Sequence, residues 1–293
     1  MQSFSMIGTN CNGILSKKES LFSVINTINP GVLFLQETKV HRKGLIKIPD
    51  FQIFEVLRKQ GGGGSILTAI HKSFQPVLVD EDEELEILVV QAKFGNLSCR
   101  YINAYGPKEG YSKTDHTISF YARLDQEIKN AKLLGHLVCV QLDANTKLGK
   151  SVIKDDIHDM SPNGQLLYDV IERDELVICN ALDACQGSIT RRRSTINGIE
   201  ESILDYFIIC QDLFVYFSSM KIDSSNVLTR YVKRKERIIV TKSDHNILIC
   251  NFSQKWNSDT KCGKEKIEIF NFNDSFGQKK YQELTSKGVL SNC

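Results

Sequence analysis

The stretch LVCVQLDANT, residues 137–146, is an apolar run of strand length that ends on two polar side chains, Asp143 and Asn145. A sheet holds the residues at its strand ends rigidly, and the following loops leave them open, so strand ends often carry catalytic and binding groups. A single acid after a strand is more often a turn residue or a helix cap. The interpretation of Asp143 therefore depends on whether other strands end in the same way.

Four other apolar runs end or begin on polar side chains of the same kinds. They are GVLFLQ before Glu37, RYINA before Tyr105, SIL before Asp205, and NILIC after the pair Asp244 and His245. Each residue alone has an ordinary interpretation, such as a packed aromatic ring at a turn or a core histidine. Together they indicate that one rim of a layered fold gathers them.

The residue types in this set suit a hard metal ion and a phosphate group. Glu37, Asp143 and Asp244 offer carboxylate oxygens, which Mg²⁺ and Mn²⁺ prefer as ligands. The scattered cysteines and histidines predict no zinc site. Asp205 and His245 could form a carboxylate-oriented imidazole.

Short apolar runs separated by turn signals predict a mixed architecture with more strands than helices. The predicted strands cover residues 3–8, 31–37, 51–57, 64–71, 85–94, 97–106, 137–143, 202–210, 214–222 and 245–252. The predicted helices cover residues 17–29, 113–132 and 164–175. The glycines at 61–64 are not followed by G-K-[ST], so we predict a flexible hairpin there rather than a phosphate-binding loop.

Composition and charge exclude several classes of protein. With 293 residues, 41% hydrophobic and 25% charged, the chain is globular rather than disordered. A net charge of +2 neither demands nor excludes a nucleic-acid partner. No apolar stretch approaches the roughly 20 residues of a membrane span, and the nine cysteines lack C-x-x-C pairs. We therefore expect no membrane association, reduced thiols and an intracellular location.

The sequence changes character at about residue 254. The stretch QKWNSDTKCGKEK is polar, and one helix-like segment follows before the sequence stops. We therefore predict a single domain over residues 1–254, and a polar linker with a truncated C-terminal segment over residues 255–293.

Six short motifs follow one another in a recognisable order between residues 3 and 254. They are TNCNG (9–13), LQET (35–38), NAYGP (103–107), LDANT (142–146), ILDYFI (203–208) and SDH (243–245). Their order, spacing and apolar flanks resemble the DNase I-like endonuclease/exonuclease/phosphatase superfamily. The resemblance implies an α/β fold, a four-layered α/β sandwich with two mostly antiparallel sheets packed face to face.

Within this superfamily the chain is most similar to the apurinic-type endonuclease domain of non-LTR (LINE-type) retrotransposon polyproteins. The similarity rests on LEILVVQAKFGNLSCRYINAYGP (85–107), on GSITRRRSTINGIEESILDYFIIC (187–210) and on the polar tail. In such polyproteins a connector of this kind leads towards a reverse transcriptase, and the stretch after residue 254 is too short to hold a polymerase.

The resemblance implies a metal site and a catalytic set. The metal, Mg²⁺ or in its place Mn²⁺, would be held by Glu37, Asn10 and Asp244. The catalytic residues that it implies are Asp143 on the attacking water, Asn145 and Tyr105 on the phosphate, and His245 oriented by Asp205. Whether Asp143 or His245 acts as the base stays open at this point.

Further residues are implied on the phosphate or DNA side, and the sequence also departs from the family pattern. The phosphate or DNA contacts are expected from Asn12, Thr190, Arg191, Arg192 and Arg193. Asn12 stands where apurinic endonucleases have an acid, which leaves abasic-site specificity and the number of metal ions undetermined. A second basic cluster, KRKER at 233–237, suits either a DNA contact or a solvated hairpin.

The function expected from this resemblance is Mg²⁺-dependent nicking of double-stranded DNA, which would leave a 3′ hydroxyl for target-primed reverse transcription. DNA is then the expected partner, no partner protein is inferred, and a nuclear location would give access to it. Two alternatives stay open. One is an apurinic endonuclease or a phosphoinositide phosphatase with the same site. The other is a non-catalytic DNA-binding or interaction module co-opted from a retroelement.

Overall fold

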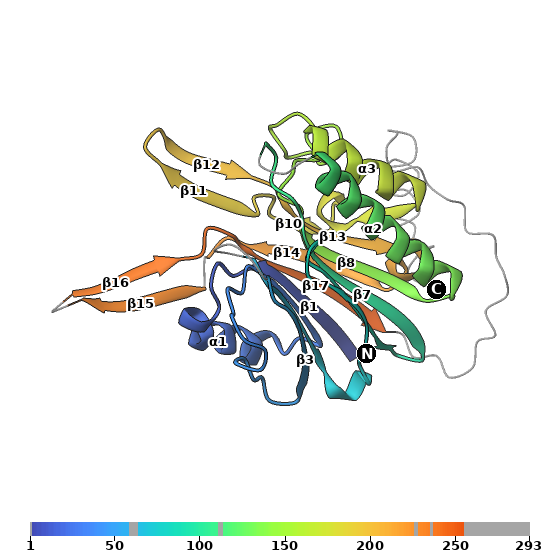
Figure 1. The fold of residues 1–293 in the computed structure, drawn as a ribbon, viewed down its shortest axis with the longest axis horizontal. Coiled ribbons are helices and arrows are strands. Elements are labelled where there is room, and N and C mark those ends of the chain that lie inside the picture. Colours follow the sequence, from blue (N-terminus) through green and yellow to red (C-terminus); the bar gives the residue numbers. More distant parts are fainter. Residues whose placement is uncertain (1, 59–63, 111–113, 226–227, 235–236, 255–293) are drawn as a thin grey trace. The chain divides into compact units, whose positions relative to one another are not determined.

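Two β-sheets form the centre of the chain in this computed structural model, which describes residues 2–58, 64–110, 114–225, 228–234 and 237–254 (Figure 1). The first sheet has seven strands in the order β10-β14-β17-β1-β2-β4-β3. These strands are β1 (Gln2–Asn10), β2 (Val32–Gln36), β3 (Phe51–Val56), β4 (Ile66–His71), β10 (Cys185–Gln186), β14 (Phe217–Asp223) and β17 (Ile247–Gln254). Strand β1 runs parallel to β2 and antiparallel to β17, so the C-terminal ends of β1 and β2 lie beside the start of β17.

The second sheet has six strands in the order β5-β6-β7-β8-β13-β9. These strands are β5 (Val77–Asp82), β6 (Ile87–Phe94), β7 (Leu97–Tyr105), β8 (Leu137–Asp143), β9 (Leu176–Ile178) and β13 (Asp205–Cys210). Only the β7–β8 pair is parallel among the described pairings of this sheet. Two hairpins extend beyond the sheets (Figure 1): β11 (Arg191–Thr195) with β12 (Gly198–Ser202), and β15 (Thr229–Arg234) with β16 (Arg237–Lys242).

Helices cover the outer faces of both sheets. Helix α1 (Lys18–Ile28) packs against the first sheet, while α2 (Thr114–Leu133) and α3 (Pro162–Arg173) lie over the second (Figure 1). The short elements are η1 (Leu15–Lys17), η2 (Lys72–Phe74), η3 (Cys179–Ala181) and α4 (Gln211–Phe214). None of the described helices is long and apolar enough to cross a membrane. The helix, sheet, sheet, helix order confirms the predicted four-layered α/β sandwich.

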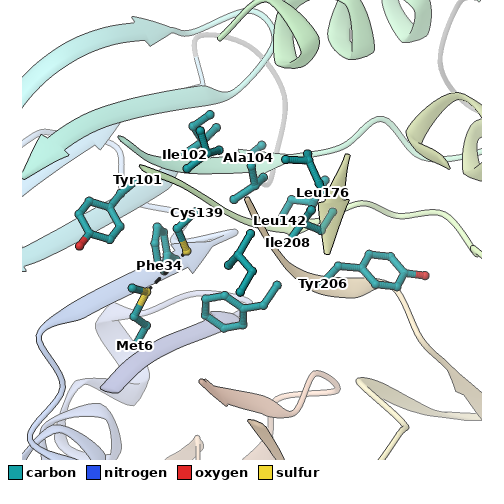
Figure 2. Packing of buried hydrophobic residues seen from close by; sticks show 14 of the residues in the cluster. Met6, Phe34, Tyr101, Ile102, Ala104, Cys139, Leu142, Leu176, Tyr206 and Ile208 are labelled. Carbon is teal, nitrogen blue, oxygen red and sulfur yellow. Dashed lines mark hydrogen bonds between the residues drawn. The ribbon is translucent and has the colours of Figure 1, made fainter. Parts of the chain in front are cut away.

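The strands are apolar on both faces because one face of each sheet packs against the other sheet and the opposite face packs against helices. Along β1, Met6 belongs to the core between the sheets, and its neighbour Ile7 belongs to the core under α1. Figure 2 shows the inter-sheet layer, in which Met6 Sδ lies 3.5 Å from Cys139 Sγ. The Phe34 ring meets the Phe207 ring edge-on at 5.9 Å. Full burial of such large side chains on both sides of the strands stabilises the sandwich.

A layer of buried amides crosses from one sheet to the other next to the strand ends. Gln36 Nε2 donates to Asn103 Oδ1 at 2.6 Å and to Gln141 Oε1 at 2.5 Å. A Cβ atom on Gly8 would lie 2.4 Å from Gln141 Cδ, so the glutamine occupies space that this glycine leaves open. The hydrogen bond from Gln36 Nε2 fixes the Gln141 side chain in this space.

The structure differs from the sequence prediction at the sheet edges and around the arginines at 191–193. Strand β5, strand β9 and both hairpins were not predicted, and the strand predicted for 202–210 is the end of β12 followed by β13. Arg191, Arg192 and Arg193 therefore lie in a strand rather than in a loop. The linker predicted for 255–293, the first three glycines of 61–64 and Lys235 lie outside the described residues.

Candidate active site

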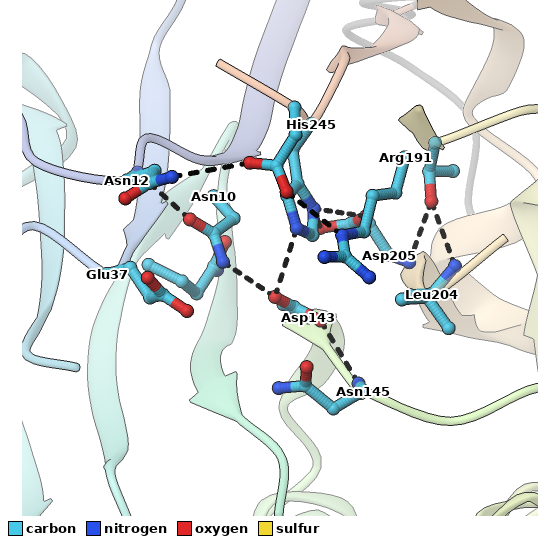
Figure 3. A network of polar contacts seen from close by, with 12 residues as sticks. Asn10, Asn12, Glu37, Asp143, Asn145, Arg191, Leu204, Asp205 and His245 are labelled. Atoms are coloured by element: carbon cyan, nitrogen blue, oxygen red, sulfur yellow. Dashed lines mark hydrogen bonds and ion pairs between the residues drawn. The ribbon is translucent and has the colours of Figure 1, made fainter. Parts of the chain in front are cut away.

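The strand ends named by the sequence meet at one rim of the sandwich. Asn10 closes β1 and pairs in register with Gln36, which directly precedes Glu37. In the second sheet Asp143 pairs in register with Tyr105 on one side and with Asp205 on the other. Strands β1, β2, β7 and β8 end at this rim and β13 begins there. Figure 3 shows Asn10, Glu37, Asp143 and Asp205 at these strand ends.

Asp143, Asp205 and His245 form the buried centre of this rim. His245 Nδ1 lies 2.9 Å from Asp205 Oδ2, and His245 Nε2 lies 3.9 Å from Asp143 Oδ2. Both carboxylates are fully buried, and His245 is only 6% exposed. Asn10 Nδ2 donates to Asp143 Oδ2 at 2.8 Å, and the Asn145 amide donates to Asp143 Oδ1 at 3.0 Å. The orientation of both Asp143 and His245 is thus fixed by hydrogen bonds.

The pKa values of both His245 and Asp143 are raised, for different reasons. Burial alone would lower the pKa of His245, but the negative charges of Asp205 and Asp143 raise it to about 9. Burial, with the charge of Asp205 added, raises the pKa of Asp143 to about 7, although His245 works against this rise. At neutral pH the imidazole is therefore a cation, and Asp143 titrates close to neutral pH.

Glu37 lies at the end of β2 with its carboxylate surrounded by donors. Tyr105 donates its hydroxyl hydrogen to Glu37 Oε1, and Lys39 Nζ lies 3.4 Å from Glu37 Oε2. Burial favours the neutral acid, but the Tyr105 hydrogen bond and the charges of Lys108 and Lys39 together lower the pKa of Glu37. Burial and the nearby acids raise the pKa of Tyr105, so its hydroxyl stays a donor. Glu37 is a carboxylate at neutral pH.

Asn10 is the last residue of β1, and Asn12 lies in the loop that follows it. The Asn12 backbone amide donates to Asn10 Oδ1 at 2.9 Å, and Asn12 Nδ2 lies 3.4 Å from Asp244 Oδ1. Lys39 Nζ donates to Asn12 Oδ1 at 2.5 Å. Lys39 thus lies between Glu37 and Asn12. Asn12 is the residue that stands where apurinic endonucleases have an acid.

Asp244 is held at the other side of the centre by the β11–β12 hairpin. Arg191 Nε lies 3.1 Å from Asp244 Oδ2, and the Arg192 amide donates to the Asp244 carbonyl at 2.7 Å. Burial raises the pKa of Asp244, but the positive charges of His245 and Arg191 outweigh this effect and lower it. Arg191 and His245 also form an isolated bridge, so the hairpin and the S-D-H segment are joined through the backbone.

The remaining predicted residues have different surroundings. Asn145 Nδ2 donates to the Gly106 carbonyl at 2.9 Å, and Asn145 adopts a left-handed backbone with φ 50°. Thr190 is fully buried, and its hydroxyl oxygen accepts from the amides of Leu204 at 2.9 Å and Asp205 at 3.1 Å. Thr190 therefore positions Asp205, and its phosphate contact stays a prediction. Arg192 and Arg193 are exposed, and Arg192 pairs with Glu201 across the hairpin.

Replacing Thr190 with valine should lower the free energy of unfolding by about 1–3 kcal/mol. Valine has nearly the same shape but leaves two buried amides without an acceptor. Urea unfolding of the two proteins measures the difference. Thr27→Val removes an exposed hydroxyl of α1 and should change stability by less than about 0.5 kcal/mol. Equal stability of Thr190→Val and the wild type would contradict this role.

Two groups of side chains on the rim could hold a metal ion. Ligand atoms of Asp143, Asp205 and His245 lie within 4.8 Å of one another. A cation bound there would have to displace the proton of His245, which already neutralises this group. Glu37 is ionised at neutral pH, and Asn10 and Asp244 offer oxygen ligands on the same rim. This second group fits a hard divalent cation better than the first.

Sequence reasoning missed several residues that shape the site. Lys39 and Lys108 compensate the charge of Glu37, and Lys39 stands only two positions after it in LQETK. Asn180 donates from Nδ2 to the Asp205 carbonyl at 3.0 Å and accepts from the Phe207 amide at 3.0 Å, which fixes β13. Asn180 follows the unpredicted strand β9, so no motif marked it.

Solved structures share this architecture at low sequence identity. The endonuclease domain of TRAS1, a telomere-specific non-LTR retrotransposon, is 15% identical and has a TM-score of 0.62 over 86% of this chain and 99% of that domain. The AP endonuclease LMAP from Leishmania major is 14% identical, with a TM-score of 0.69 over 87% of this chain and 89% of that one. The 3'-5' exonuclease NExo from Neisseria meningitidis is 14% identical, with a TM-score of 0.63 over 86% of this chain and all of that one. No protein-family model and no curated protein sequence matches this chain. At sequence identities this low, the structural similarity establishes the fold alone.

Proposed function

We propose, from the DNase I-like fold that this chain has in common with the endonuclease/exonuclease/phosphatase superfamily, that it is a metal-dependent DNA endonuclease. One observation carries the proposal. A charged imidazole, held by Asp205 at 2.9 Å, lies beside Asp143 on the same rim as the ionised Glu37. Phosphodiester hydrolysis needs a base for water, positive charge on the phosphate, and support for the leaving oxygen. This arrangement offers groups for each.

The pKa values support Asp143 as the base. With a pKa of about 9, His245 already carries its proton at neutral pH and cannot accept another. Asp143, with a pKa of about 7, is in the range where a general base works best near neutral pH. Asp143 would take the proton of the attacking water, while His245, Asn145 and Tyr105 would bind the non-bridging phosphate oxygens.

The proposed cofactor is Mg²⁺, with Mn²⁺ as a substitute. Glu37, Asn10 and Asp244 would hold it, because they offer oxygen donors and the pKa of Glu37 is lowered. When bound there, the ion would stabilise negative charge on the phosphate and on the leaving 3′ oxygen.

The proposed substrate is double-stranded DNA, nicked to leave a 3′ hydroxyl that primes reverse transcription. The sequence likeness to non-LTR retrotransposon endonucleases supports this choice, as does the exposed pair Arg192 and Arg193 on the hairpin that contacts Asp244. Phosphate contacts from such arginines would make binding depend on salt. We place the domain at residues 1–254, the linker at 255–293 and the protein in the nucleus as part of the same proposal.

Nicking of supercoiled plasmid tests the proposed function. With Mg²⁺ the wild-type protein should produce relaxed circles, and EDTA should abolish them. Glu37→Gln removes one charge of the metal site and should nick at least about 100-fold more slowly. Glu19→Gln, which makes the same change on the exposed side of α1, should nick like the wild type.

Intact plasmid in every reaction would contradict an endonuclease. Two further substrates then separate the alternatives. Cleavage confined to an oligonucleotide with an abasic site would indicate an apurinic endonuclease, and phosphate release from a soluble phosphoinositide would indicate the phosphatase. DNA binding without turnover of any substrate would indicate the non-catalytic module.

A further inference from the structure

Lys17 is a buried lysine that lies against the loop after β1. It is only 5% exposed, although a lysine is rarely buried unless its amino group is paired. Its Nζ donates to the carbonyl of Cys11 at 2.5 Å and to the carbonyl of Asn12 at 2.8 Å. These two carbonyls belong to Cys11, which lies between the two site asparagines, and to Asn12, the second of them. The amino group thus binds the backbone of the loop and does not reach towards solvent.

The same loop also binds the backbone of Glu37 and of the residue after it. The Gly13 amide donates to the Glu37 carbonyl at 2.8 Å, and the Ile14 amide donates to the Thr38 carbonyl at 3.0 Å. Glu37 has a left-handed backbone with φ 44°, which is unfavourable for a residue other than glycine. Its conformation therefore depends on partners that fix the backbone, and the loop supplies them.

We propose that Lys17 is a positioning residue for the metal side of the site. By binding the Cys11 and Asn12 carbonyls, it fixes the loop that aims Asn10 and Asn12 and that holds the backbone of Glu37. This inference rests on the proposed function and assigns to it a residue that is outside all six motifs. Lys17 contacts neither substrate nor metal in this role.

Replacing Lys17 with methionine tests the proposal, because methionine keeps the length of the side chain and removes the amino group. Residues that orient metal ligands typically contribute 10–100-fold to metal affinity, so Mn²⁺ should bind about tenfold more weakly. Electron paramagnetic resonance of free Mn²⁺ measures this without turnover. The Gly13 and Ile14 amides should also exchange their hydrogens faster than in the wild type, because the loop opens more often.

Two further variants separate positioning from charge. Lys18→Met removes the same charge one residue later, from an exposed side chain that lies over the Phe22 ring, and should bind Mn²⁺ like the wild type. Lys17→Arg keeps donors for the carbonyls and should restore most of the affinity. Equal Mn²⁺ affinity in folded Lys17→Met and the wild type would overturn the proposal. If Lys17→Met does not fold, Lys17→Gln takes its place, and an unchanged affinity there would overturn it equally.

The experiment separates this inference from the proposed function. A wild-type protein that binds no Mn²⁺ would count against the proposed metal site. The exchange rates of the Gly13 and Ile14 amides would still decide whether Lys17 orders the loop. Unchanged exchange in Lys17→Met, or in Lys17→Gln where it takes its place, would reject the inference even if the wild type nicks DNA.

Discussion

Replacing Asp143 with asparagine should lower the rate of plasmid nicking by about 10²–10⁴-fold. Asparagine keeps the shape of the side chain and can still accept the Asn10 hydrogen bond, but it cannot take a proton from water. The measurement is the single-turnover rate of conversion of supercoiled to relaxed plasmid at saturating Mg²⁺. The variant removes a buried carboxylate next to Asp205, but its NH₂ group cannot accept from the Asn145 backbone amide, so its stability is measured beside its activity.

The control for this variant is Asp174→Asn. Asp174 is also a buried aspartate, at the C-terminal end of α3 and away from the rim, and its replacement should leave the nicking rate unchanged. A nicking rate within tenfold of the wild type in Asp143→Asn would reject Asp143 as the base. Thermal unfolding of both variants would show whether any lost activity comes from a lost fold.

Replacing His245 with alanine should abolish detectable nicking, which corresponds to a loss of at least about 10³-fold. The change removes the cation that would face the phosphate in the proposed mechanism and leaves Asp143 and Asp205 buried without it. His245→Asn is the second variant, because its amide can still donate to Asp205 while it carries no charge. It should be as inactive as His245→Ala, and near-ultraviolet circular dichroism should confirm its tertiary packing.

A second histidine of the chain offers a matched control. His158 Nδ1 lies 2.9 Å from Asp156 Oδ1, the same distance as in the His245 pair, but His158 lies in the loop between β8 and α3 and not in the buried centre. His158→Ala should nick at the wild-type rate. Retained nicking in both His245 variants would contradict the assignment and would leave positive charge on the phosphate to Arg191 or Lys39.

The centre of the fold could be predicted from the sequence because its strands are buried on both faces. Continuous apolar runs such as GVLFLQ and LVCVQL are typical of such strands, and their polar ends located the rim. Strand β5 lacks this signal, because it lies at the edge of the sheet and none of its residues is buried. The β11–β12 hairpin lacks it as well, since two of its five pairs join an arginine to a glutamate and none joins two apolar residues.

The residues of the candidate site could be listed from motifs, but not their contacts. Nothing in the sequence indicated that Lys39 lies between Glu37 and Asn12, or that Thr190 accepts the amides at the start of β13. Such contacts depend on how two sheets and their loops meet, which local patterns do not encode. Lys17 illustrates the limit, because a lysine before a helix is ordinarily a solvent-exposed residue.

The left-handed backbone at Glu37 also bears on the history of the chain. An L-residue with this conformation costs about 1–2 kcal/mol relative to glycine. Stability alone would therefore favour glycine or asparagine at position 37. Among related sequences, a retained glutamate at this position would indicate that its carboxylate is under selection.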